Sequence, residues 1–163
     1  LDKTRFLYVG RMSKEKGIFD FIKMFKKIDL NAELSIVGNS ENYNENDNRI
    51  KLLGYVADPQ SLINIYDSHN ITILPSFTEA TPYVVDESLS RLRPVIIFKD
   101  IEYIIRDKIG IFVCERNLNS FLNVTKYIMD NYTEIQKKME KNVLPTKNSM
   151  IKQISDIIKT KSS

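Results

Sequence analysis

The sequence has 163 residues, of which 42% are hydrophobic and 28% are charged, as expected of one folded domain. Its single cysteine, Cys114, and single histidine, His69, exclude a disulfide framework and zinc sites built from several cysteines or histidines. The 24 basic and 21 acidic residues give a net charge of +3, weaker than the clustered basic excess of nucleic-acid-binding proteins. We therefore expect no nucleic-acid partner.

Short apolar strands alternate with amphipathic helices along the chain. The first predicted elements are a strand over Arg5–Gly10, a helix over Ile18–Ile28, strands over Glu33–Gly38 and Ile50–Val56, a helix from Asp58 to Tyr66, and a strand over Ile71–Leu74. They are followed by a helix over Thr81–Leu92, strands over Pro94–Phe98 and Gly110–Cys114, and helices over Leu118–Tyr132, Glu134–Lys141 and Met150–Lys159. This alternation predicts a single α/β domain over residues 1–163, with a doubly wound, mostly parallel sheet of about six strands and helices on both faces.

The turn after the first strand carries two cations. Arg11 and Lys16 lie between Gly10 and Gly17, immediately before the first helix. A helix N-terminus favours anions, and the Arg guanidinium and Lys ammonium would strengthen a contact with phosphate. On charge alone, a solvated basic turn is the simpler interpretation. The glycine spacing fits neither a Walker loop nor the dinucleotide-binding pattern.

The segment after the fourth strand predicts a second helix start at the same edge of the sheet. Thr81 is expected to be the N-cap of this helix and Pro82 its first residue. Because proline has no N–H, the backbone N–H groups of Thr81, Tyr83 and Val84 would be the free donors at this helix end.

Two carboxylates flank these donors. Glu79 precedes the helix, and Glu87 lies four residues after Tyr83, on the same helical face. Acidic residues also occur at helix starts simply because the helix dipole favours them. The first and fourth strands, however, are neighbours at the switch point of a doubly wound sheet, where ligands bind. We therefore expect cations, N–H donors and carboxylates to meet in one crevice, suited to a ligand with hydroxyls at both ends and phosphate between.

Five segments, in this order and spacing, are similar to one known family. They are VGRMSKEKG (residues 9–17), ELSIVG (33–38), LLGYVAD (52–58), ILPSFTEATPYVVDES (73–88) and PVI (94–96). The set resembles the C-terminal, donor-binding domain of GT-B retaining glycosyltransferases of glycosyltransferase group 1 (family 4 type), which has a Rossmann-like fold. The chain departs from the family in three places: Ser88 stands where alanine is frequent, Arg93 where a glycine usually precedes the Pro-Val-Ile strand, and His69-Asn70 where Ala-Asp is frequent.

The resemblance implies a role for each matching residue. Arg11 and Lys16 would hold and neutralise the diphosphate leaving group, and Glu79 would contact the donor sugar near the reacting carbon. Glu87 would bind the ribose hydroxyls. The other implied contacts are Gly10 and Gly38 close to the nucleotide, Tyr55, Val56 and Asp58 beside the base, and the N–H groups of Thr81, Tyr83 and Val84 toward phosphate or sugar. The resemblance implies neither a metal nor a cofactor.

The implied function is that of the donor-binding half of a hexosyltransferase, which transfers a sugar from a nucleoside diphosphate sugar to a glycan or lipid acceptor with retention. The acceptor would bind an N-terminal domain of the same protein, so we expect this half to be inactive alone. The expected location is the cytoplasm, and contact of the helix over Met150–Lys159 with the inner face of the membrane stays open. Two alternatives also stay open: a non-catalytic nucleotide-sugar-binding module and a GT-B sugar-nucleotide epimerase.

Overall fold

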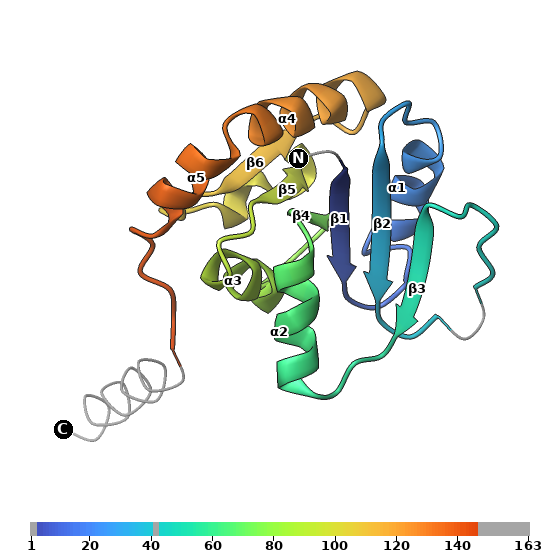
Figure 1. Ribbon diagram of the computed structural model, residues 1–163, viewed down its shortest axis with the longest axis horizontal. Coiled ribbons are helices and arrows are strands. Elements are labelled where there is room, and N and C mark those ends of the chain that lie inside the picture. Colours follow the sequence, from blue (N-terminus) through green and yellow to red (C-terminus); the bar gives the residue numbers. More distant parts are fainter. Residues whose placement is uncertain (1–2, 41–42, 147–163) are drawn as a thin grey trace.

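A computed structural model describes residues 3–40 and 43–146 (Figure 1). The strands are β1 (Thr4–Val9), β2 (Ala32–Val37), β3 (Ile50–Gly54), β4 (Ile71–Leu74), β5 (Val95–Phe98) and β6 (Ile111–Cys114). The helices are α1 (Ile18–Phe25), α2 (Pro59–Ser68), α3 (Tyr83–Ser90), α4 (Leu118–Asp130) and α5 (Tyr132–Met139). The helix predicted near the C-terminus lies outside the described residues.

The strands form one six-stranded sheet in the order β3-β2-β1-β4-β5-β6, and every neighbouring pair is parallel. The predicted α/β class and strand number are thereby confirmed. The chain first builds outward from β1 to β2 and β3, and then returns to the other side of β1 to add β4. The loops that follow β1 and β4 therefore diverge at the switch point, where a crevice forms.

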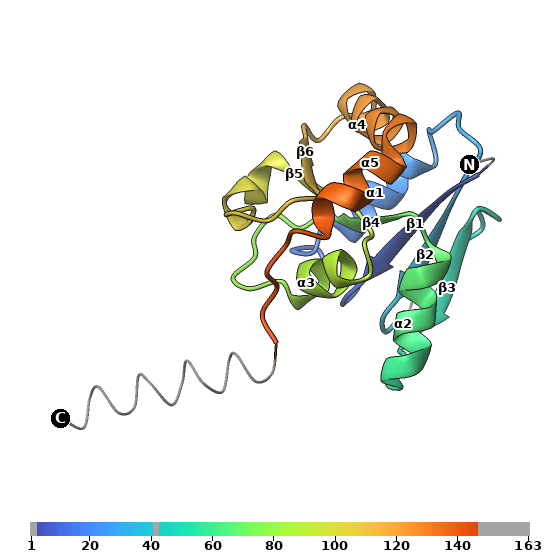
Figure 2. The same cartoon turned by 60° about the vertical axis from the view of Figure 1, so that its left-hand side comes forward.

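Helices cover both faces of the sheet, with α1, α4 and α5 on one side and α2 and α3 on the other (Figure 2). The side chains of the central strand β1 contribute to the hydrophobic cores on both faces of the sheet, because successive side chains point to opposite faces. Phe6 and Tyr8 belong to the larger core cluster, in which the Phe6 ring lies 5.5 Å from that of Phe121 of α4. Leu7 joins a smaller cluster with Tyr66 of α2. Burial on both sides explains why β4 and β5 are apolar throughout.

A short 3₁₀ segment over Lys99–Ile104, which was not predicted, connects β5 to β6. Its two buried side chains, Ile101 and Ile104, are three residues apart. The segment is kinked at Ile101, whose φ and ψ of −122° and 23° are not helical.

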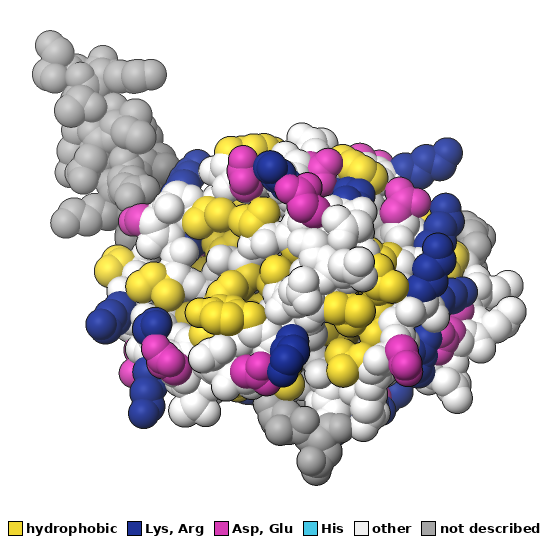
Figure 3. Space-filling model, turned by 90° about the horizontal axis from the view of Figure 1, so that it is seen from above, with side chains coloured by type: hydrophobic (Ala, Val, Ile, Leu, Met, Phe, Trp, Pro, Cys, Tyr) yellow, Lys and Arg dark blue, Asp and Glu magenta, His cyan; other side chains and the backbone are white. Residues whose placement is uncertain are grey.

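The side of α4 and α5, opposite the carboxyl ends of the strands, exposes several separate hydrophobic patches among charged side chains (Figure 3). Ion pairs one turn apart, Lys126–Asp130 on α4 and Lys138–Glu134 on α5, lie on the solvated faces of these helices. Within the described residues, no helix is both long enough and apolar enough to cross a membrane.

Candidate functional site

A cavity of about 480 Å³ opens at the carboxyl edge of the sheet. Its walls come from the turns that follow β1, β2, β3 and β4 and from the first turns of α3. Eleven of the twelve predicted site residues line it, namely Gly10, Arg11, Lys16, Gly38, Tyr55, Val56, Glu79, Thr81, Tyr83, Val84 and Glu87. The structure therefore brings together two constellations that are more than 60 residues apart in the sequence.

Two glycines allow the loops at this edge to pack against each other. The backbone of Gly38 packs so closely against Gly10 that a Cβ atom at Gly38 would lie 2.0 Å from the Gly10 carbonyl oxygen. The turns after β1 and β2 are therefore in direct contact. A Cβ atom at Gly17 would lie 2.0 Å from the carbonyl oxygen of Pro75, and Gly17 also has a left-handed φ of 65°. Any side chain at either position would force the loops apart and change the shape of the cavity.

Lys16 and Glu79 form an ion pair inside the cavity. The Lys16 ammonium lies 2.7 Å from Glu79 Oε1, and the side chains are 24% and 7% exposed. The Ser76 hydroxyl donates to the same oxygen at 2.6 Å. Glu79 is thus held by a cation from the β1 turn and by a hydroxyl from its own loop.

The backbone of the loop that carries Glu79 is tied down from neighbouring segments. The Tyr103 hydroxyl donates to the Glu79 carbonyl at 2.7 Å and accepts from the Glu79 N–H at 3.0 Å. The Arg116 guanidinium, beyond β6, donates to the carbonyls of Pro75 and Ser76 at 3.0 and 3.3 Å. These contacts fix the direction in which the Glu79 side chain enters the cavity.

The Arg116 side chain is itself well anchored. Its guanidinium carbon lies 4.0 Å from the ring centroid of Phe77 and 4.4 Å from that of Phe98, within cation–π range. It also pairs with Asp100 at 2.7 Å. The loop after β4 is therefore held by two kinds of contact with Arg116, whose own position is fixed by Phe98 and Asp100.

Arg11 differs from Lys16 in being open to solvent. Its side chain is 79% exposed and lies 3.8 Å from Glu15, a loose surface pair. The Arg11 carbonyl accepts a hydrogen bond of 2.6 Å from the Tyr8 hydroxyl, which fixes the turn rather than the side chain. Burial, with the charge of Glu79, raises the pKa of Tyr8 far above its usual value, so this hydroxyl stays protonated. The guanidinium is free to reorient toward an anion in the cavity.

Glu87 has a neutral partner. The Tyr66 hydroxyl of α2 donates to Glu87 Oε2 at 2.8 Å. Burial and the charge of Glu87 both raise the pKa of Tyr66, so its hydroxyl remains a donor at any physiological pH. The second carboxylate of the cavity is thus held by a neutral hydroxyl, whereas Glu79 is held by a cation.

The start of α3 differs from the prediction. The N-cap is Pro82, and α3 begins at Tyr83, so the assignment of Thr81 as N-cap was wrong. Pro82 has extended φ and ψ angles of −79° and 95°, which the restriction on proline φ permits. Tyr83 and Val84 are then the first two helical residues, whose N–H groups have no carbonyl four residues earlier within the helix. Thr81 still lines the cavity, one residue before the cap.

The residues predicted beside the base occupy two different environments. Tyr55, which is 80% exposed, and Val56 line the cavity after β3. Asp58 is not among the lining residues. Its carboxylate caps α2 by accepting from the Ser61 N–H at 2.7 Å and from the Ser61 hydroxyl at 2.6 Å. A side chain engaged in this way has a structural role, so nothing in the geometry supports a contact between Asp58 and a base.

The single histidine and cysteine lie away from the cavity. His69 is the C-cap of α2, its Nδ1 lies 2.6 Å from the Ile65 carbonyl, and burial lowers its pKa. Cys114 is buried at the end of β6, as predicted, and burial raises its pKa to about 12. Neither side chain is positioned to take part in chemistry at the strand ends.

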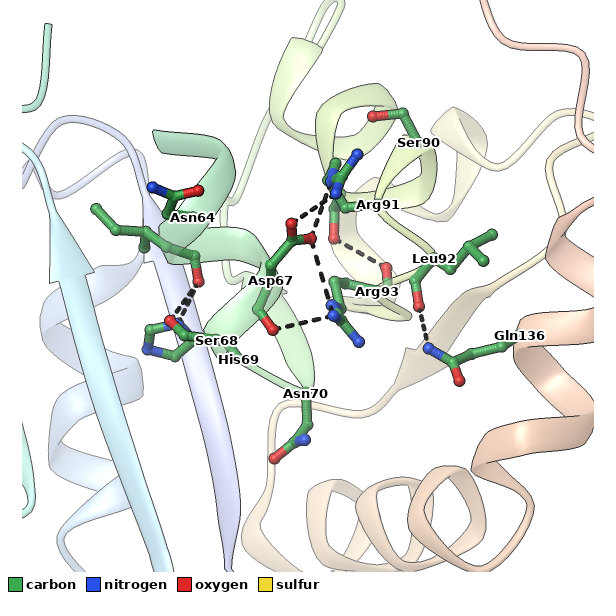
Figure 4. Close-up of polar contacts among 12 residues, drawn as sticks. Asn64, Asp67, Ser68, His69, Asn70, Ser90, Arg91, Leu92, Arg93 and Gln136 are labelled. Carbon is green, nitrogen blue, oxygen red and sulfur yellow. Dashed lines mark hydrogen bonds and ion pairs between the residues drawn. The ribbon is translucent and has the colours of Figure 1, made fainter. Parts of the chain in front are cut away.

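Two of the three departures from the family pattern, Ser88 and Arg93, have structural explanations. Ser88 is buried, and its hydroxyl donates to the Arg93 carbonyl at 2.9 Å. The left-handed conformation, for which glycine is favoured, occurs at Leu92 (φ 55°) rather than at Arg93. The Arg93 guanidinium instead donates to the Asp67 carbonyl at 2.9 Å, which links the turn after α3 to the end of α2 (Figure 4).

Sequence reasoning missed five side chains that hold the predicted residues or their loops in place: Tyr8, Tyr66, Ser76, Tyr103 and Arg116. Ser76 adjoins a proline at the end of β4, within a segment that carried the resemblance, so its place at the site was open to prediction. Tyr66 and Tyr103 bond to residues 21 and 24 positions away, and local sequence gives no sign of such pairings.

The sequence profile of the family described as glycosyl transferases group 1 matches residues 3–131. The chain belongs to this family. Among curated relatives, the capsular polysaccharide biosynthesis glycosyltransferase CapM of Staphylococcus aureus is 31% identical in an alignment 102 positions long, which covers 55% of this chain and 26% of CapM. The resemblance inferred from the five segments is thereby confirmed.

Solved structures agree with the family assignment at the level of the fold. Sucrose-phosphate synthase of Thermosynechococcus elongatus superposes with a TM-score of 0.78 at 18% identity, over 98% of this chain and 45% of that protein. HepE of Anabaena, in complex with UDP and glucose, gives a TM-score of 0.72 at 16% identity, over 99% of this chain and 49% of HepE. This glycosyltransferase group 1 domain thus has the fold of the C-terminal half of GT-B glycosyltransferases and spans less than half the length of these relatives.

Proposed function

We propose that this domain is the donor-binding half of a glycosyltransferase that transfers a sugar from a nucleoside diphosphate sugar to a glycan or lipid acceptor, with retention. The acceptor would bind a second domain of the same protein, which would act in the cytoplasm. The observation that carries the proposal is the cavity in which the Lys16–Glu79 pair, Glu87 and the start of α3 meet.

The Lys16–Glu79 pair fits the chemistry of such a donor, with Lys16 binding phosphate and Glu79 binding the sugar. The anomeric carbon and the β-phosphate of a nucleoside diphosphate sugar share one oxygen atom. A sugar-binding carboxylate and a phosphate-binding cation must therefore be close neighbours, and these two side chains are 2.7 Å apart. The lysine ammonium has three donors, so it can hold Glu79 and a phosphate oxygen at once.

Departure of the diphosphate is the step that the site would accelerate. Negative charge grows on the leaving oxygens as the glycosidic bond breaks, and preorganised donors lower the energy of that charge. Lys16, the mobile guanidinium of Arg11, and the N–H groups of Tyr83 and Val84 at the start of α3 would supply those donors. Glu79 would hold the sugar while the bond breaks, and Glu87 would hold the ribose.

The relatives support both the donor class and the kind of acceptor. HepE has been solved with UDP-glucose, and the name of another similar structure, WaaB, describes a lipopolysaccharide outer core galactosyltransferase. CapM is named for capsular polysaccharide biosynthesis. We propose a sugar nucleotide as the donor and a growing polysaccharide or glycolipid as the acceptor on this basis.

Calorimetric titration of the chain with UDP, GDP, ADP and CMP tests the donor site. We expect one nucleotide to bind, with an affinity about tenfold lower in Arg11→Ala, since a hydrogen bond to a charged group contributes about 1.5–3 kcal/mol. Asp58→Asn is the matched control outside the cavity and should leave the affinity unchanged. Failure of all four nucleotides to bind would contradict the proposal.

The products formed by the full-length protein separate transfer from the two alternatives. Incubation with the matching sugar nucleotide and a glycan or lipid acceptor should yield a glycosylated product. Free sugar isomers without that product would identify an epimerase. Binding without turnover would identify a regulatory module.

A further inference from the structure

The carboxylate of Glu87 is held from behind by a residue that does not line the cavity. Tyr66 is 1% exposed, and its hydroxyl donates to Glu87 Oε2 at 2.8 Å. Glu87 is exposed, so the bond joins a hydroxyl buried in the core to a solvent-accessible carboxylate. Glu87 itself lines the cavity, so the two residues form a chain from the core to the ligand site.

The Tyr66 ring is fixed by its surroundings. It packs with Leu7 and Val37 in a buried cluster, and Leu62 and Ile65 of α2 and Val56 after β3 pack against that cluster. A ring enclosed in this way cannot swing without opening the contact between α2 and the sheet. Its hydroxyl therefore has one available position.

A second link fixes the register of α2 against α3. Asp67, the residue after Tyr66, forms a bidentate pair with Arg91, at 2.9 Å to Nε and 2.5 Å to the terminal nitrogen. Figure 4 shows the Asp67 carboxylate between Arg91 and Arg93. Arg91 is the C-cap of α3 and follows Glu87 by four residues. A second link between α2 and the end of α3 therefore lies next to the Tyr66–Glu87 bond along both segments.

This inference rests on the proposed function. We propose that Tyr66 is a positioning residue that makes the site selective for a nucleotide with both ribose hydroxyls. A carboxylate offers about four lone-pair sites on its two oxygens. With Oε2 of Glu87 engaged by Tyr66, Oε1 remains to accept from the 2′ and 3′ hydroxyls of a ligand in the cavity that Glu87 lines. Without this donor, the flexible glutamate would have to be ordered when the ligand binds, which lowers affinity.

The test compares Tyr66→Phe with the wild-type chain by calorimetry. The probes are UDP, GDP and ADP and their 2′,3′-dideoxy counterparts, which lack the two hydroxyls. For the base that binds, Tyr66→Phe should weaken the ribonucleotide about tenfold and the dideoxynucleotide less than twofold. The ratio of the two affinities, which measures selectivity for ribose, should then fall about five- to tenfold. A merely structural role would weaken both ligands equally.

Tyr132→Phe is the matched control. Its hydroxyl donates to the Asn70 carbonyl at 2.8 Å, its ring is partly buried, and it lies away from the cavity lining. Loss of this hydroxyl should leave both affinities and their ratio unchanged. If Tyr132→Phe lowered the ratio as much as Tyr66→Phe, the selectivity would reflect general loosening and the inference would be wrong.

A double-mutant cycle with Glu87→Ala adds an independent check. Once the carboxylate is absent, Tyr66 has nothing to position, so adding Tyr66→Phe should not change ribonucleotide affinity further. A persistent tenfold effect in that background would overturn the inference, as would an unchanged affinity in Tyr66→Phe alone. If no nucleotide bound the wild-type chain, the proposed function itself would fail and the inference with it, a result distinct from binding without a Tyr66 effect.

Discussion

The two carboxylates of the cavity look equivalent in the sequence but are supported in opposite ways. Glu79 is paired with a cation, Lys16, and accepts from a serine hydroxyl. Glu87 accepts from the neutral hydroxyl of Tyr66. The first carboxylate is thus paired with a positive charge before any ligand binds, whereas the second is held by a neutral donor.

Because of this difference, we expect the two carboxylates to contribute differently to the free energy of unfolding and to ligand affinity. Removing one member of a buried ion pair leaves an uncompensated charge and destabilises the fold. A carboxylate that bonds to a neutral hydroxyl can be replaced by an amide with little effect on folding, because the amide oxygen still accepts. We therefore expect changes around Glu79 to reduce stability strongly, and changes at Glu87 to reduce mainly ligand affinity.

The largest effect on stability is expected for Lys16→Met. It would leave the buried Glu79 carboxylate without its cation and lower the free energy of unfolding by about 3 kcal/mol. Urea unfolding measures this loss. The double variant Lys16→Met/Glu79→Gln, which removes both charges, should recover most of it. A loss below about 1 kcal/mol in Lys16→Met would mean that the pair is effectively solvated.

Ser76→Ala should have the next largest effect. It removes a buried hydroxyl that donates to Glu79 Oε1 at 2.6 Å, and we expect a loss of about 1.5 kcal/mol in urea unfolding. Ser61→Ala is the matched control, because its hydroxyl makes a bond of the same length to Asp58 in an exposed position. We expect less than about 0.5 kcal/mol there, since water replaces the lost bond. Equal losses at the two serines would contradict the claim that the Glu79 site is buried.

Asp67→Asn should destabilise the chain by about 0.5–1 kcal/mol. Its ion pair with Arg91 is bidentate but largely exposed, and such pairs contribute little. Thermal unfolding at low and at high salt tests this expectation, because salt screens an exposed pair and should reduce the difference from wild type. A difference that salt does not change would place the contribution in packing rather than in charge.

Glu87→Gln should have the smallest effect on stability, within about 0.5 kcal/mol of wild type in urea unfolding, because the Tyr66 hydroxyl keeps an acceptor. Its nucleotide affinity should nevertheless fall about tenfold, since the charge that favours the ribose hydroxyls is removed. A variant that lost stability but kept its affinity would reverse the roles assigned to the two carboxylates.

Much of this arrangement could be predicted because parallel topology determines it. The alternation of strands and helices predicts that β1 lies next to β4. The turns that carry Arg11, Lys16 and Glu79 are therefore neighbours irrespective of the side chains in them. The supporting contacts could not be predicted in this way. Arg116 contacts the loop after β4 from 41 residues away in the sequence. The Asp58 carboxylate caps α2, and this local hydrogen bond occupies the group that was expected to contact a ligand.

The most direct test of the account is an NMR titration of the ¹⁵N-labelled chain with the nucleoside diphosphate that binds. We expect the largest amide shifts at Gly10, Gly38, Tyr83 and Val84, which line the cavity. A second hollow of about 380 Å³, lined by Lys23, Lys27 and Asn117 among others, offers a basic alternative between α1 and α4. Shifts concentrated there, with the cavity residues unchanged, would contradict the assignment of the donor site.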